Sequence, residues 1–329
     1  MLLSVIVPVY NTQPYLRDCL ESLIHQGLDE TEYEVICVND GSTDDSLKTL
    51  TDYAERYPNI VVLNRENGGV SAARNAGLRA VRGKYTAFCD SDDCIRSGSL
   101  GEIVRFMAQN DLQAVVMDGF RYVPEQYAYE TEPTPQMDIT ILPHSEYSAR
   151  NVCSLVIESK ILQDCDIGFY DGMQYGEDTL FAGTACTHMA LRGAKIGVLH
   201  TQVYLYRSRG DSATHSLCRE KHFEDMHDIA RAYASLLQRE IPLESVRDNL
   251  QKRVGAAVSA MLFDNLQCGL YTPKALFAML REEGLYPFKA QWWAVKEAKT
   301  LKLRCINLWK YTFRSPILYR LYFAVICRK

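Results

Sequence analysis

Short apolar segments alternate with amphipathic segments throughout the first 120 residues of the chain. The apolar runs are rich in β-branched residues, as in residues 3–8 (LSVIVP), and they are too short for typical helices. They predict strands that are buried on both faces. The intervening segments, such as residues 15–26, place their apolar residues on one helical face. This alternation predicts an α/β fold with a mostly parallel sheet and helices on both faces.

The same patterns give approximate bounds for each element. The predicted strands of the first part are residues 3–8, 34–38, 59–63, 85–89 and 114–117, and the predicted helices are 15–26, 46–57, 70–81 and 99–109. Further along the chain we expect a hairpin or loop over the sheet at 121–142, helices at 145–165 and 177–191, and short strands at 195–199 and 202–207. From about residue 219 onward the pattern is helical, with prolines as punctuation.

The charge of the chain is unevenly distributed. The formal net charge of −5 argues against nonspecific nucleic-acid binding, which requires a positive field. Residues 298–329, however, contain eight of the 36 basic residues and no acidic residue. The tail is therefore electrostatically distinct from the acidic remainder of the chain.

The cysteines and the N-terminus indicate the compartment. The eleven cysteines form no C-x-x-C pair, and several lie inside apolar runs, which is typical of buried thiols in a reducing environment. Met1 leads directly into the first apolar run without a basic leader, so we expect no signal peptide. No run approaches the roughly 20 apolar residues of a membrane span. We therefore expect a cytoplasmic protein.

Polar residues follow each of the first four predicted strands. In an open parallel sheet, ligands bind at the carboxyl ends of the strands. The segments there read PVYN (8–11), NDGSTD (39–44), NGGVS with ARN (67–71 and 73–75) and DSDD (90–93). Each segment alone is ordinary turn or helix-start chemistry. Four such segments at one edge of a sheet predict a binding site.

Three carboxylates crowd residues 90–93, where like charges repel and raise one another's pKa. A divalent cation that prefers oxygen ligands, Mn²⁺ or Mg²⁺, would neutralise them together with phosphate oxygens. The D-x-D spacing puts Asp90 and Asp92 on the same side of an extended segment, so one can reach the ligand and the other the metal. The alternative is that Asp93 lies near the start of the next helix, where acidic residues are favourable.

Five segments of this chain, in order, resemble the motifs of the family 2 inverting glycosyltransferases. They read SVIVPVYN, VICVNDGSTDDS, NGGVSAARNAG, YTAFCDSDD and GEDTLF, and they span about the first two thirds of the chain. This family has the GT-A fold and builds bacterial capsules, exopolysaccharides and lipopolysaccharide. The resemblance implies a Rossmann-like GT-A catalytic domain over residues 1–215, with a nucleotide-sugar half at about 1–118 and an acceptor half at about 119–215. A C-terminal helical region over 216–329 would follow.

The resemblance also implies that the donor is a UDP-sugar. The residues that would contact it are Pro8, Tyr10, Asn11, Asp40, Arg74, Asp90 and Ser91. Pro8 and Tyr10 would flank the uracil, and Asp40 would hydrogen-bond its edge. Arg74 would lie near the diphosphate or the base, and Asp90 would contact the ribose or the donor sugar. Asp92 would bind the Mn²⁺ or Mg²⁺ ion.

By the same resemblance, Asp178 of the GED segment would be the catalytic base, with Glu177 beside it on the acceptor side. The leaving diphosphate gains charge, which a cation and an arginine can stabilise. One base opposite the leaving group implies a single displacement with inversion, so that an α-linked donor gives a β-linkage. From its spacing alone, Asp178 is an acid at the N-terminus of the helix that it begins.

Residues 206–212 (YRSRGDS) follow the last predicted strand and resemble a family segment that folds over the donor diphosphate. Arg207, Arg209 and Ser212 carry groups suited to phosphate, although such charged loops are commonly just solvated. His200 and His215 lie nearby in the sequence, and a histidine can complete a metal shell.

The tail at 298–329 combines its basic residues with tryptophan, tyrosine and phenylalanine, which suits the surface of an anionic membrane. The alternative is a helix that packs on the acidic domain. Membrane contact would place the protein on the inner face of the cell membrane as a peripheral protein. A lipid-linked glycan, as is common in the family, would then be the acceptor.

The sequence also bears on three other functions. A dehydrogenase-type Rossmann domain needs a glycine fingerprint directly after the first strand, where this chain has PVYN, and is rejected. A nucleotidyltransferase acting on sugar phosphates usually needs a glycine-rich basic loop early in the chain, and none precedes Gly41. A non-catalytic nucleotide-sugar-binding relative would be expected to lose Asp92 or Asp178, and both are present.

Overall fold

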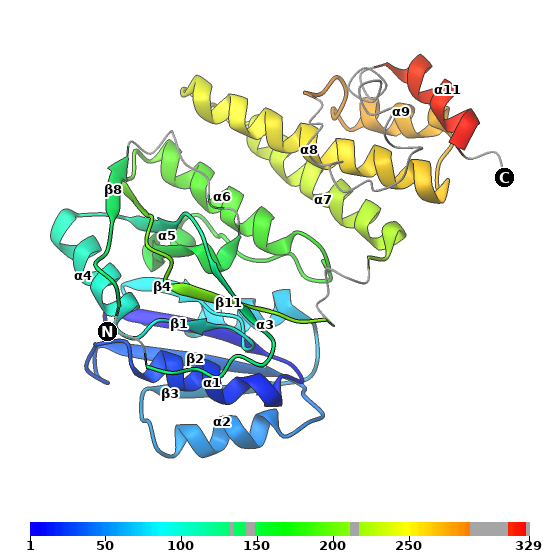
Figure 1. Cartoon of the computed structure of the whole chain (residues 1–329). Coiled ribbons are helices and arrows are strands. Elements are labelled where there is room, and N and C mark those ends of the chain that lie inside the picture. The colour runs from blue at the N-terminus through cyan, green and yellow to red at the C-terminus, as the bar shows by residue number, and fades with distance from the viewer. Residues whose placement is uncertain (132–133, 143–148, 150, 211–216, 290–314, 327–329) are drawn as a thin grey trace. The chain divides into compact units, whose positions relative to one another are not determined.

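The computed structural model describes residues 1–131, 134–142, 149, 151–210, 217–289 and 315–326 (Figure 1). The chain divides into two compact units. The first unit comprises Met1–Met173 and Glu177–His215, and the second comprises Gln174–Gly176 and Ser216–Lys329.

The first unit is built on an eight-stranded sheet. In order across the sheet its strands are β3 (Ile60–Arg65), β2 (Tyr33–Asp40), β1 (Leu3–Val9), β4 (Tyr85–Phe88), β9 (Leu155–Glu158), β6 (Ala114–Met117), β10 (Ile196–Leu199) and β8 (Ile139–Leu142). The pairs β3–β2, β2–β1, β1–β4 and β6–β10 are parallel, whereas β9 and β8 run antiparallel to their neighbours. The predicted α/β fold with a mostly parallel sheet is confirmed.

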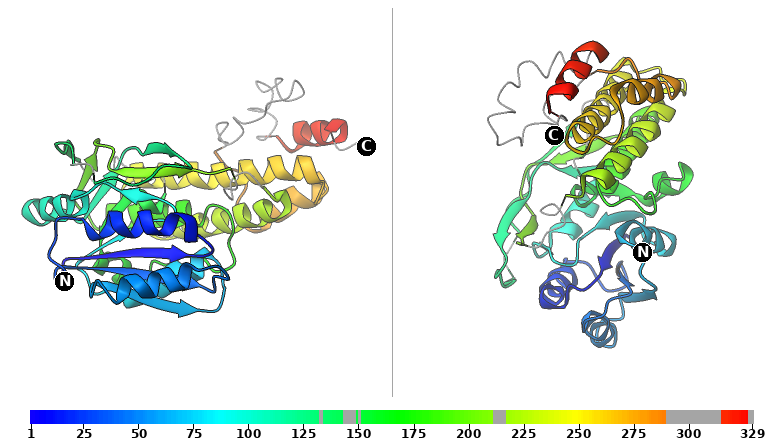
Figure 2. Two further views of the ribbon diagram at one scale, coloured as in Figure 1. Left: turned by 60° about the horizontal axis from the view of Figure 1, so that its bottom comes forward. Right: turned by 90° about the vertical axis from the view of Figure 1, so that its right-hand side faces the viewer.

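Among the described residues of this unit there are six α-helices. They are α1 (Gln13–Ile24), α2 (Ser46–Ala54), α3 (Val70–Ala80), α4 (Ser99–Asn110), α5 (Ser159–Asp164) and α6 (Glu177–Leu191). α1 and α2 pack against each other, and α3 packs on β1 and β2 (Figure 2). The connection from β3 to β4 runs back across the sheet, so right-handed crossovers put α3 on the face opposite α1 and α2.

α3 lies unusually close to β1. A Cβ atom on Gly77 would lie 2.5 Å from Cγ2 of Ile6, so this position of α3 has no room for a side chain. The close approach matters for function because α3 carries Arg74, which is buried.

An aromatic cluster positions the start of α6 beside the end of β4. The rings of Phe169 and Phe181 stack with centroids 4.2 Å apart, and both meet Phe88 edge-on at 5.7 and 5.4 Å. Phe181 lies one turn after the first residue of α6, and Phe88 is the last residue of β4. Packing of these large rings therefore fixes where the two predicted acidic segments meet.

The predicted helix at 145–165 is wrong over residues 152–158 and correct over residues 159–164. This segment contains a 3₁₀ turn at Val152–Ser154, the strand β9 and the short helix α5. Leu155, Val156 and Ile157 are completely buried between β4 and β6. Pairing with a strand on each side outweighs the helical spacing of the apolar residues in this window. Residues 143–148 and 150 of the predicted helix lie outside the described part of the chain.

Of the two alternatives predicted for 121–142, the hairpin is wrong, whereas residues 125–131 and 134–138 form a loop. β7 (Arg121–Pro124) joins a small second sheet with β5 (Cys94–Ile95) and β11 (Tyr204–Ser208), whereas β8 joins the edge of the main sheet. β7 and β8 thus belong to different sheets, and each pairs with a strand far away in the sequence. No local pattern specifies such long-range partners.

The second unit is helical in its described residues, as predicted. Its helices are α7 (Arg219–Leu237), α8 (Glu244–Cys268), α9 (Pro273–Glu282) and α11 (Pro316–Ile326). α7 and α8 pack along each other, and α11 is fixed by Tyr319, whose buried hydroxyl donates to the Leu262 carbonyl at 2.9 Å. No helix among the described segments is long and apolar enough to cross a bilayer.

Candidate active site

Asp40, at the end of β2, holds the loop before α3 through its carboxylate. The side chain is buried and accepts hydrogen bonds from the backbone N–H groups of Gly68 at 3.1 Å and Gly69 at 2.8 Å. Arg65 of β3 forms an ion pair with it at 3.2 Å. Gly41 is in the left-handed region, and a Cβ atom there would lie 2.7 Å from the Asn67 nitrogen. The loop before α3 thus lies directly over the end of β2.

The end of β1 is joined to the same edge by Asn11. This residue has a φ of 50°, and its side-chain oxygen accepts a hydrogen bond from the Thr43 backbone N–H at 2.8 Å. Its own N–H donates to the Ser42 hydroxyl at 3.1 Å. The neighbouring Tyr10 is 49% exposed, whereas Pro8 is buried within β1. Tyr10 and Asn11 therefore offer accessible groups at this edge, and Pro8 contributes to the core.

Arg74 connects the acidic segment after β4 to the start of α6. Its guanidinium donates to Asp90 at 2.8 Å and to Glu177 at 3.0 Å, and lies 5.3 Å from the centre of the Phe169 ring. Burial by itself would lower the pKa of Arg74, but the adjacent carboxylates, Asp90 foremost, raise it overall. Two predicted segments that lie 87 residues apart in the sequence are thereby brought to one place.

Asp92, the predicted metal ligand, is paired with Arg209 at 3.0 Å, and its side chain is 26% exposed. Burial raises the pKa of the Asp92 carboxyl, and the nearby charge of Asp90 raises it further, whereas Arg209 and Arg207 lower it. Asp92 is a carboxylate that could hold a divalent ion together with ligands from a bound substrate. Within the described ranges, no three His, Cys, Asp or Glu side chains converge as a protein-only metal site would require.

Asp93 is part of the scaffold. It is buried, accepts a hydrogen bond from the Tyr204 hydroxyl at 2.8 Å and accepts another from the Arg207 backbone N–H at 2.7 Å. The Tyr204 hydroxyl in turn accepts from the Asp90 N–H at 3.1 Å. The alternative that Asp93 lies near the start of the next helix as a favourable acid is wrong, because β5 intervenes and α4 begins at Ser99.

Ser91 lies inside the same turn. Its hydroxyl is buried and accepts a hydrogen bond from the Thr12 hydroxyl at 2.9 Å. The Ser91 side chain therefore links the segment after β4 to the start of α1. To contact a donor as predicted, Ser91 would use its backbone groups or the hydroxyl that already accepts from Thr12.

Arg207 and Arg209, which the sequence treats alike, have different surroundings. The Arg207 side chain is 2% exposed and holds surrounding loops together. Its guanidinium donates to the carbonyl oxygens of Asp92, Glu125 and Tyr127 and to the carboxylate of Asp18. Arg209 is more exposed, at 16%, and faces Asp92. Ser212 and His215 lie outside the described residues, and His200 contacts Asp118 and Thr140.

Asp178 lies in the first turn of α6, next to the Glu177 that Arg74 holds. Its carboxylate accepts hydrogen bonds from the Thr179 backbone N–H at 2.6 Å and from the Thr179 hydroxyl. Burial raises the pKa of Asp178, and Arg74 and the Thr179 N–H oppose this increase. Burial and the charge of Asp178 likewise raise the pKa of Glu177. A carboxylate with a raised pKa beside a cation is suited to accept a proton.

The sequence did not identify two residues that order this site. Tyr204 lies more than 110 residues from the acids that it contacts, and no local pattern could have found it. Asn75 pairs its side-chain amide with both the N–H and the carbonyl of Phe169, at 2.8 Å each. Asn75 falls within the segment NGGVSAARNAG, so its position was visible in the sequence but its partner was not.

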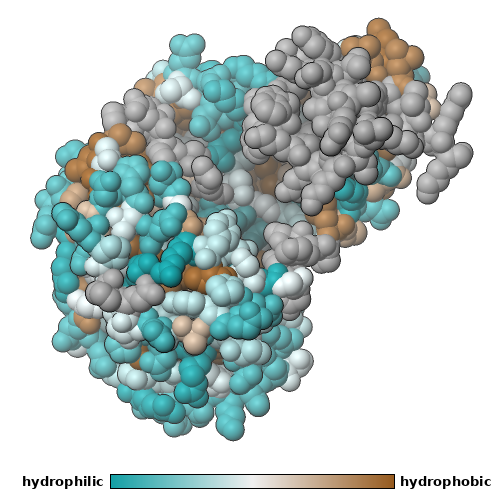
Figure 3. Space-filling model, viewed as in Figure 1, coloured by the Kyte–Doolittle hydropathy of each residue, from teal (hydrophilic) through white to brown (hydrophobic). Residues whose placement is uncertain are grey.

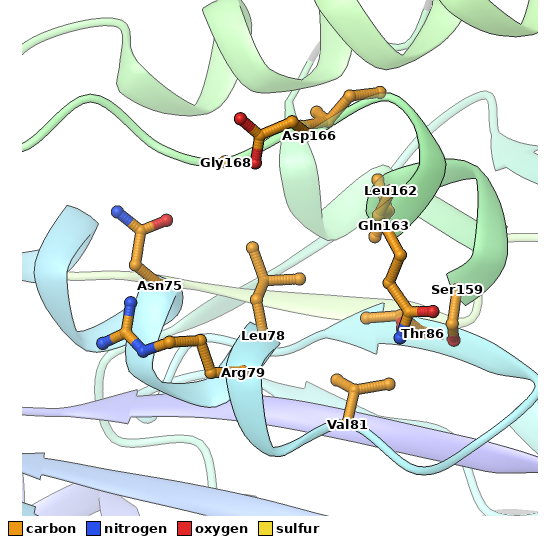
Figure 4. Close-up of a pocket in the computed structure, with 11 residues that line it drawn as sticks. Asn75, Leu78, Arg79, Val81, Thr86, Ser159, Leu162, Gln163, Asp166 and Gly168 are labelled. Atoms are coloured by element: carbon orange, nitrogen blue, oxygen red, sulfur yellow. Dashed lines mark hydrogen bonds between the residues drawn. The ribbon is translucent and has the colours of Figure 1, made fainter.

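A separate cavity of about 420 Å³ lies between α3 and the segment around α5 (Figure 4). Asn75, Leu78 and Arg79 of α3 line one side, and residues including Gln163 and Asp166 line the other. None of the predicted site residues lines this cavity. The clustered acids, and not this cavity, therefore define the candidate site.

Comparison with known proteins identifies the family of the chain. Residues 4–156 match the family model described as glycosyl transferase family 2. Over 246 residues, the chain is 32% identical to the poly(ribitol-phosphate) beta-glucosyltransferase of Bacillus spizizenii, which covers 70% of this chain and 37% of that protein. The chain belongs to glycosyl transferase family 2. The predicted family membership is thus confirmed.

Solved structures of other enzymes share the fold of this family 2 member. Residues 1–349 of Staphylococcus aureus TarS in complex with UDP-GlcNAc superpose with a TM-score of 0.69 at 21% identity, covering 98% of this chain and 91% of that one. The mannosyltransferase PcManGT of Pyrobaculum calidifontis, in complex with GDP-Man and Mn²⁺, gives a TM-score of 0.53 at 17% identity, covering 98% and 86%. The chain spans less than two thirds of the length of the curated relatives that it matches first.

Removing the buried cation should destabilise the first unit. Arg74→Met leaves Asp90 and Glu177 without their counter-charge, and breaking a buried ion pair in this way costs about 3–5 kcal/mol. Urea unfolding monitored by circular dichroism measures the change. As a control, Arg65→Met removes a pair whose arginine is 31% exposed and should cost clearly less. Equal losses for the two variants would contradict the central role of Arg74.

Proposed function

We propose that this protein is a metal-dependent inverting glycosyltransferase that moves a sugar from a UDP-sugar to a hydroxyl group of a bacterial cell-surface glycan. The contact of Arg74 with both Asp90 and Glu177 carries the proposal. Through this contact, Asp90, predicted to face the donor, and Glu177, which adjoins the predicted base Asp178, share one cation, and this supports a single site. The names of related proteins, which include a poly(ribitol-phosphate) beta-glucosyltransferase, support the substrate class.

On the donor side, we assign the uridine to the ends of β1 and β2. Tyr10 offers a largely exposed aromatic ring, and such rings favour stacking on a planar base. A carboxylate offers about four acceptor positions, and three protein groups already contact that of Asp40. The remaining position would accept a hydrogen bond from the uracil edge. The diphosphate would lie near Arg209 and Ser212, the residues of the 206–212 segment suited to phosphate.

The residues after β4 fit a divalent ion in their chemistry. Asp92 is a partly exposed carboxylate whose charge is disfavoured by burial and by Asp90, so a nearby cation would relieve an unfavourable arrangement. Mn²⁺ or Mg²⁺ typically takes one or two carboxylates and completes its shell with phosphate oxygens and water. Asp92 would hold the ion, which would stabilise the charge on the departing UDP. The Mn²⁺ in the PcManGT complex supports this assignment through the fold.

On the acceptor side, Asp178 would take the proton of the attacking hydroxyl. Its Oδ1 atom is oriented by the Thr179 N–H, and Glu177 beside it is held by Arg74. One base and one leaving group on opposite sides of the sugar carbon give a single displacement, so an α-linked UDP-sugar yields a β-linked product. The relative from B. spizizenii is named a beta-glucosyltransferase, in agreement with this stereochemistry.

Release of UDP tests the proposed reaction. The wild type is mixed with UDP-glucose or UDP-GlcNAc and a poly(ribitol phosphate) acceptor, with Mn²⁺ or with a chelator, and UDP is quantified. We expect acceptor-dependent release that requires the ion and that falls by about 10²–10⁴ in Asp178→Asn, the usual contribution of general-base catalysis. Asp52→Asn, an exposed acid on α2, is the control and should retain activity.

Other outcomes of this assay would identify a different function. Release of pyrophosphate from UTP and a sugar phosphate would indicate a nucleotidyltransferase. Tight binding of UDP-sugars without UDP release would indicate a non-catalytic binding protein. Full activity with the chelator would remove the metal from the mechanism.

The pH dependence of kcat should report the ionisation of Asp178. Only the ionised carboxylate accepts a proton, so activity is full above its pKa and declines as the pH falls through it. Because burial raises the pKa of Asp178, the acidic limb should lie above the ordinary aspartate value of about 3.9. The charge of Asp90 also raises this pKa, so Asp90→Asn should move the limb to lower pH. A limb that stays in place would argue against Asp178 as the base.

We also propose that residues 298–329 bind an anionic membrane from the cytoplasmic side and that the acceptor is linked to a lipid there. Most of this tail lies outside the described residues, but α11 belongs to it. Ile317, Leu318 and Leu321 of α11 are 68%, 38% and 62% exposed, and hydrophobic colour gathers over this helix in Figure 3. Arg320 on the same helix is exposed. An exposed apolar surface next to basic residues is typical of interfacial helices.

Vesicle binding tests the tail. The full chain should co-sediment with vesicles that contain phosphatidylglycerol and less with vesicles of phosphatidylcholine alone, because basic residues gain about 1 kcal/mol each near an anionic surface. Ile317→Ser with Leu321→Ser should weaken binding. Leu270→Ser changes a residue of the second unit that is 38% exposed and should have no effect. If the double variant bound vesicles as well as Leu270→Ser does, the apolar side chains of α11 would not contact the membrane, and the tail would be assigned to packing within the protein.

A further inference from the structure

We propose that Asp225 of α7 is a positioning residue for the catalytic base, because it fixes the three-residue segment Gln174–Gly176 that leads directly into α6. This inference rests on the proposed role of Asp178. The chain leaves the first unit after Met173, passes through these three residues and returns to the first unit at Glu177. The segment thus belongs to the helical second unit, although it adjoins the proposed base in sequence.

The carboxylate of Asp225 binds two consecutive backbone amides of this segment. Its Oδ2 atom accepts from the N–H of Gln174 at 3.0 Å and from the N–H of Tyr175 at 2.9 Å. Its Oδ1 atom lies 2.8 Å from the ammonium group of Lys221, one turn earlier on α7. The Asp225 side chain is 1% exposed, so these charge-assisted bonds are shielded from water and are stronger than neutral ones.

Tyr175 and Gly176 make further contacts with the second unit. The hydroxyl of Tyr175 accepts a hydrogen bond from the Cys218 N–H at 2.9 Å, and its ring meets His222 edge-on at 5.6 Å. Gly176 has a φ of +78°, a conformation that favours glycine, and a Cβ atom there would lie 2.9 Å from Cδ1 of Ile229. Each residue of the segment therefore has its own contact with α7 or with Cys218, the residue directly before α7.

These contacts bear on Asp178 through the backbone. Gly176 is bonded to Glu177, and Asp178 is the second residue of α6, so the direction in which the chain enters the helix sets the position of the base. On the other side, Arg74 holds Glu177. Asp178 therefore directly follows two residues that are held in place. Gly176 is held by its backbone packing on Ile229, and Glu177 is held by its side-chain ion pair with Arg74. A misplacement of about 1 Å at a reacting group can reduce a rate about 10²-fold.

These contacts of the segment are with the second unit. Two of its three backbone N–H groups donate to Asp225, and the tyrosine hydroxyl accepts from the Cys218 N–H. Asp225 therefore acts through Gln174–Gly176 and touches neither the donor-side acids nor Arg74 in any contact of the described residues. Its loss should change kcat while leaving the binding of the UDP-sugar as it was.

The chain offers a matched control in Asp264 of α8. This carboxylate is also 1% exposed and also pairs with basic side chains, with Arg219 at 3.0 Å and with His222 at 2.5 Å. It accepts no backbone N–H of Gln174–Gly176 among the described contacts. Asp225→Asn and Asp264→Asn therefore remove one buried charge each from the second unit, but only the first changes the acceptor of the segment's amides.

The experiment compares Asp225→Ala, Asp225→Asn and Asp264→Asn in the full chain by kinetics. We expect kcat to fall by about 10- to 10²-fold in Asp225→Ala, with a smaller loss in Asp225→Asn because the amide oxygen can still accept. In the Asp225 variants the KM for the UDP-sugar should remain within about twofold of the wild-type value. Asp264→Asn should retain the wild-type kcat even if its melting temperature falls as much as that of the Asp225 variants. In an Asp178→Asn background, Asp225→Ala should produce no further loss, because the group that it positions is gone.

Amide hydrogen exchange provides a readout that needs no activity. Exchange at Gln174, Tyr175 and the first turn of α6 should accelerate in Asp225→Ala and should stay as in the wild type in Asp264→Asn. Gly176→Ala, which strains the segment against Ile229, should resemble Asp225→Ala. Unchanged exchange in the Asp225 variants, or equal loss of kcat in the Asp264 variant, would overturn the positioning role. Absence of UDP release by the wild type would instead overturn the proposed function and leave the exchange result to stand by itself.

Discussion

The buried guanidinium of Arg74 is the interaction on which the candidate site depends. A cation that is almost completely removed from water requires carboxylate partners, and Arg74 takes them from two distant segments, Asp90 after β4 and Glu177 at the start of α6. Its position on α3 is possible because Gly77 lets this helix lie against β1. The packing of one helix on one strand thereby determines which acids can meet.

The acids around Arg74 have distinct roles that follow from their surroundings. Asp93 is buried, receives two hydrogen bonds and holds the turn in place. Asp92 remains partly exposed with a disfavoured charge, which suits a metal ligand. Asp178 has a raised pKa and lies at a helix start, which suits a base. The same residue type thus has three distinct environments, one that suits a scaffold, one that suits an ion ligand and one that suits a proton acceptor, because burial and the number of donors differ at each position.

We infer that the second unit bears on the proposed base through Gln174–Gly176. This segment adjoins α6 in sequence, yet its amides are bound by Asp225 and its glycine packs on Ile229. A C-terminal helical region can therefore influence the reaction without providing a group that touches the substrate. Changes in α7 would alter the rate of the enzyme while the donor-binding residues stay the same.

The sequence by itself determined the α/β class, most of the strands and helices up to residue 120, and the edge of the sheet where the candidate site residues gather. These features are encoded locally, by β-branched runs, by helical spacing and by polar residues at strand ends. Only the tertiary structure decided that residues 155–158 form a strand, that Arg207 is a buried brace while Arg209 faces Asp92, that Tyr204 bonds Asp90 and Asp93, and that Asp225 binds the amides of Gln174 and Tyr175. These outcomes depend on partners that lie tens to more than a hundred residues away, and burial between such partners outweighs any local preference.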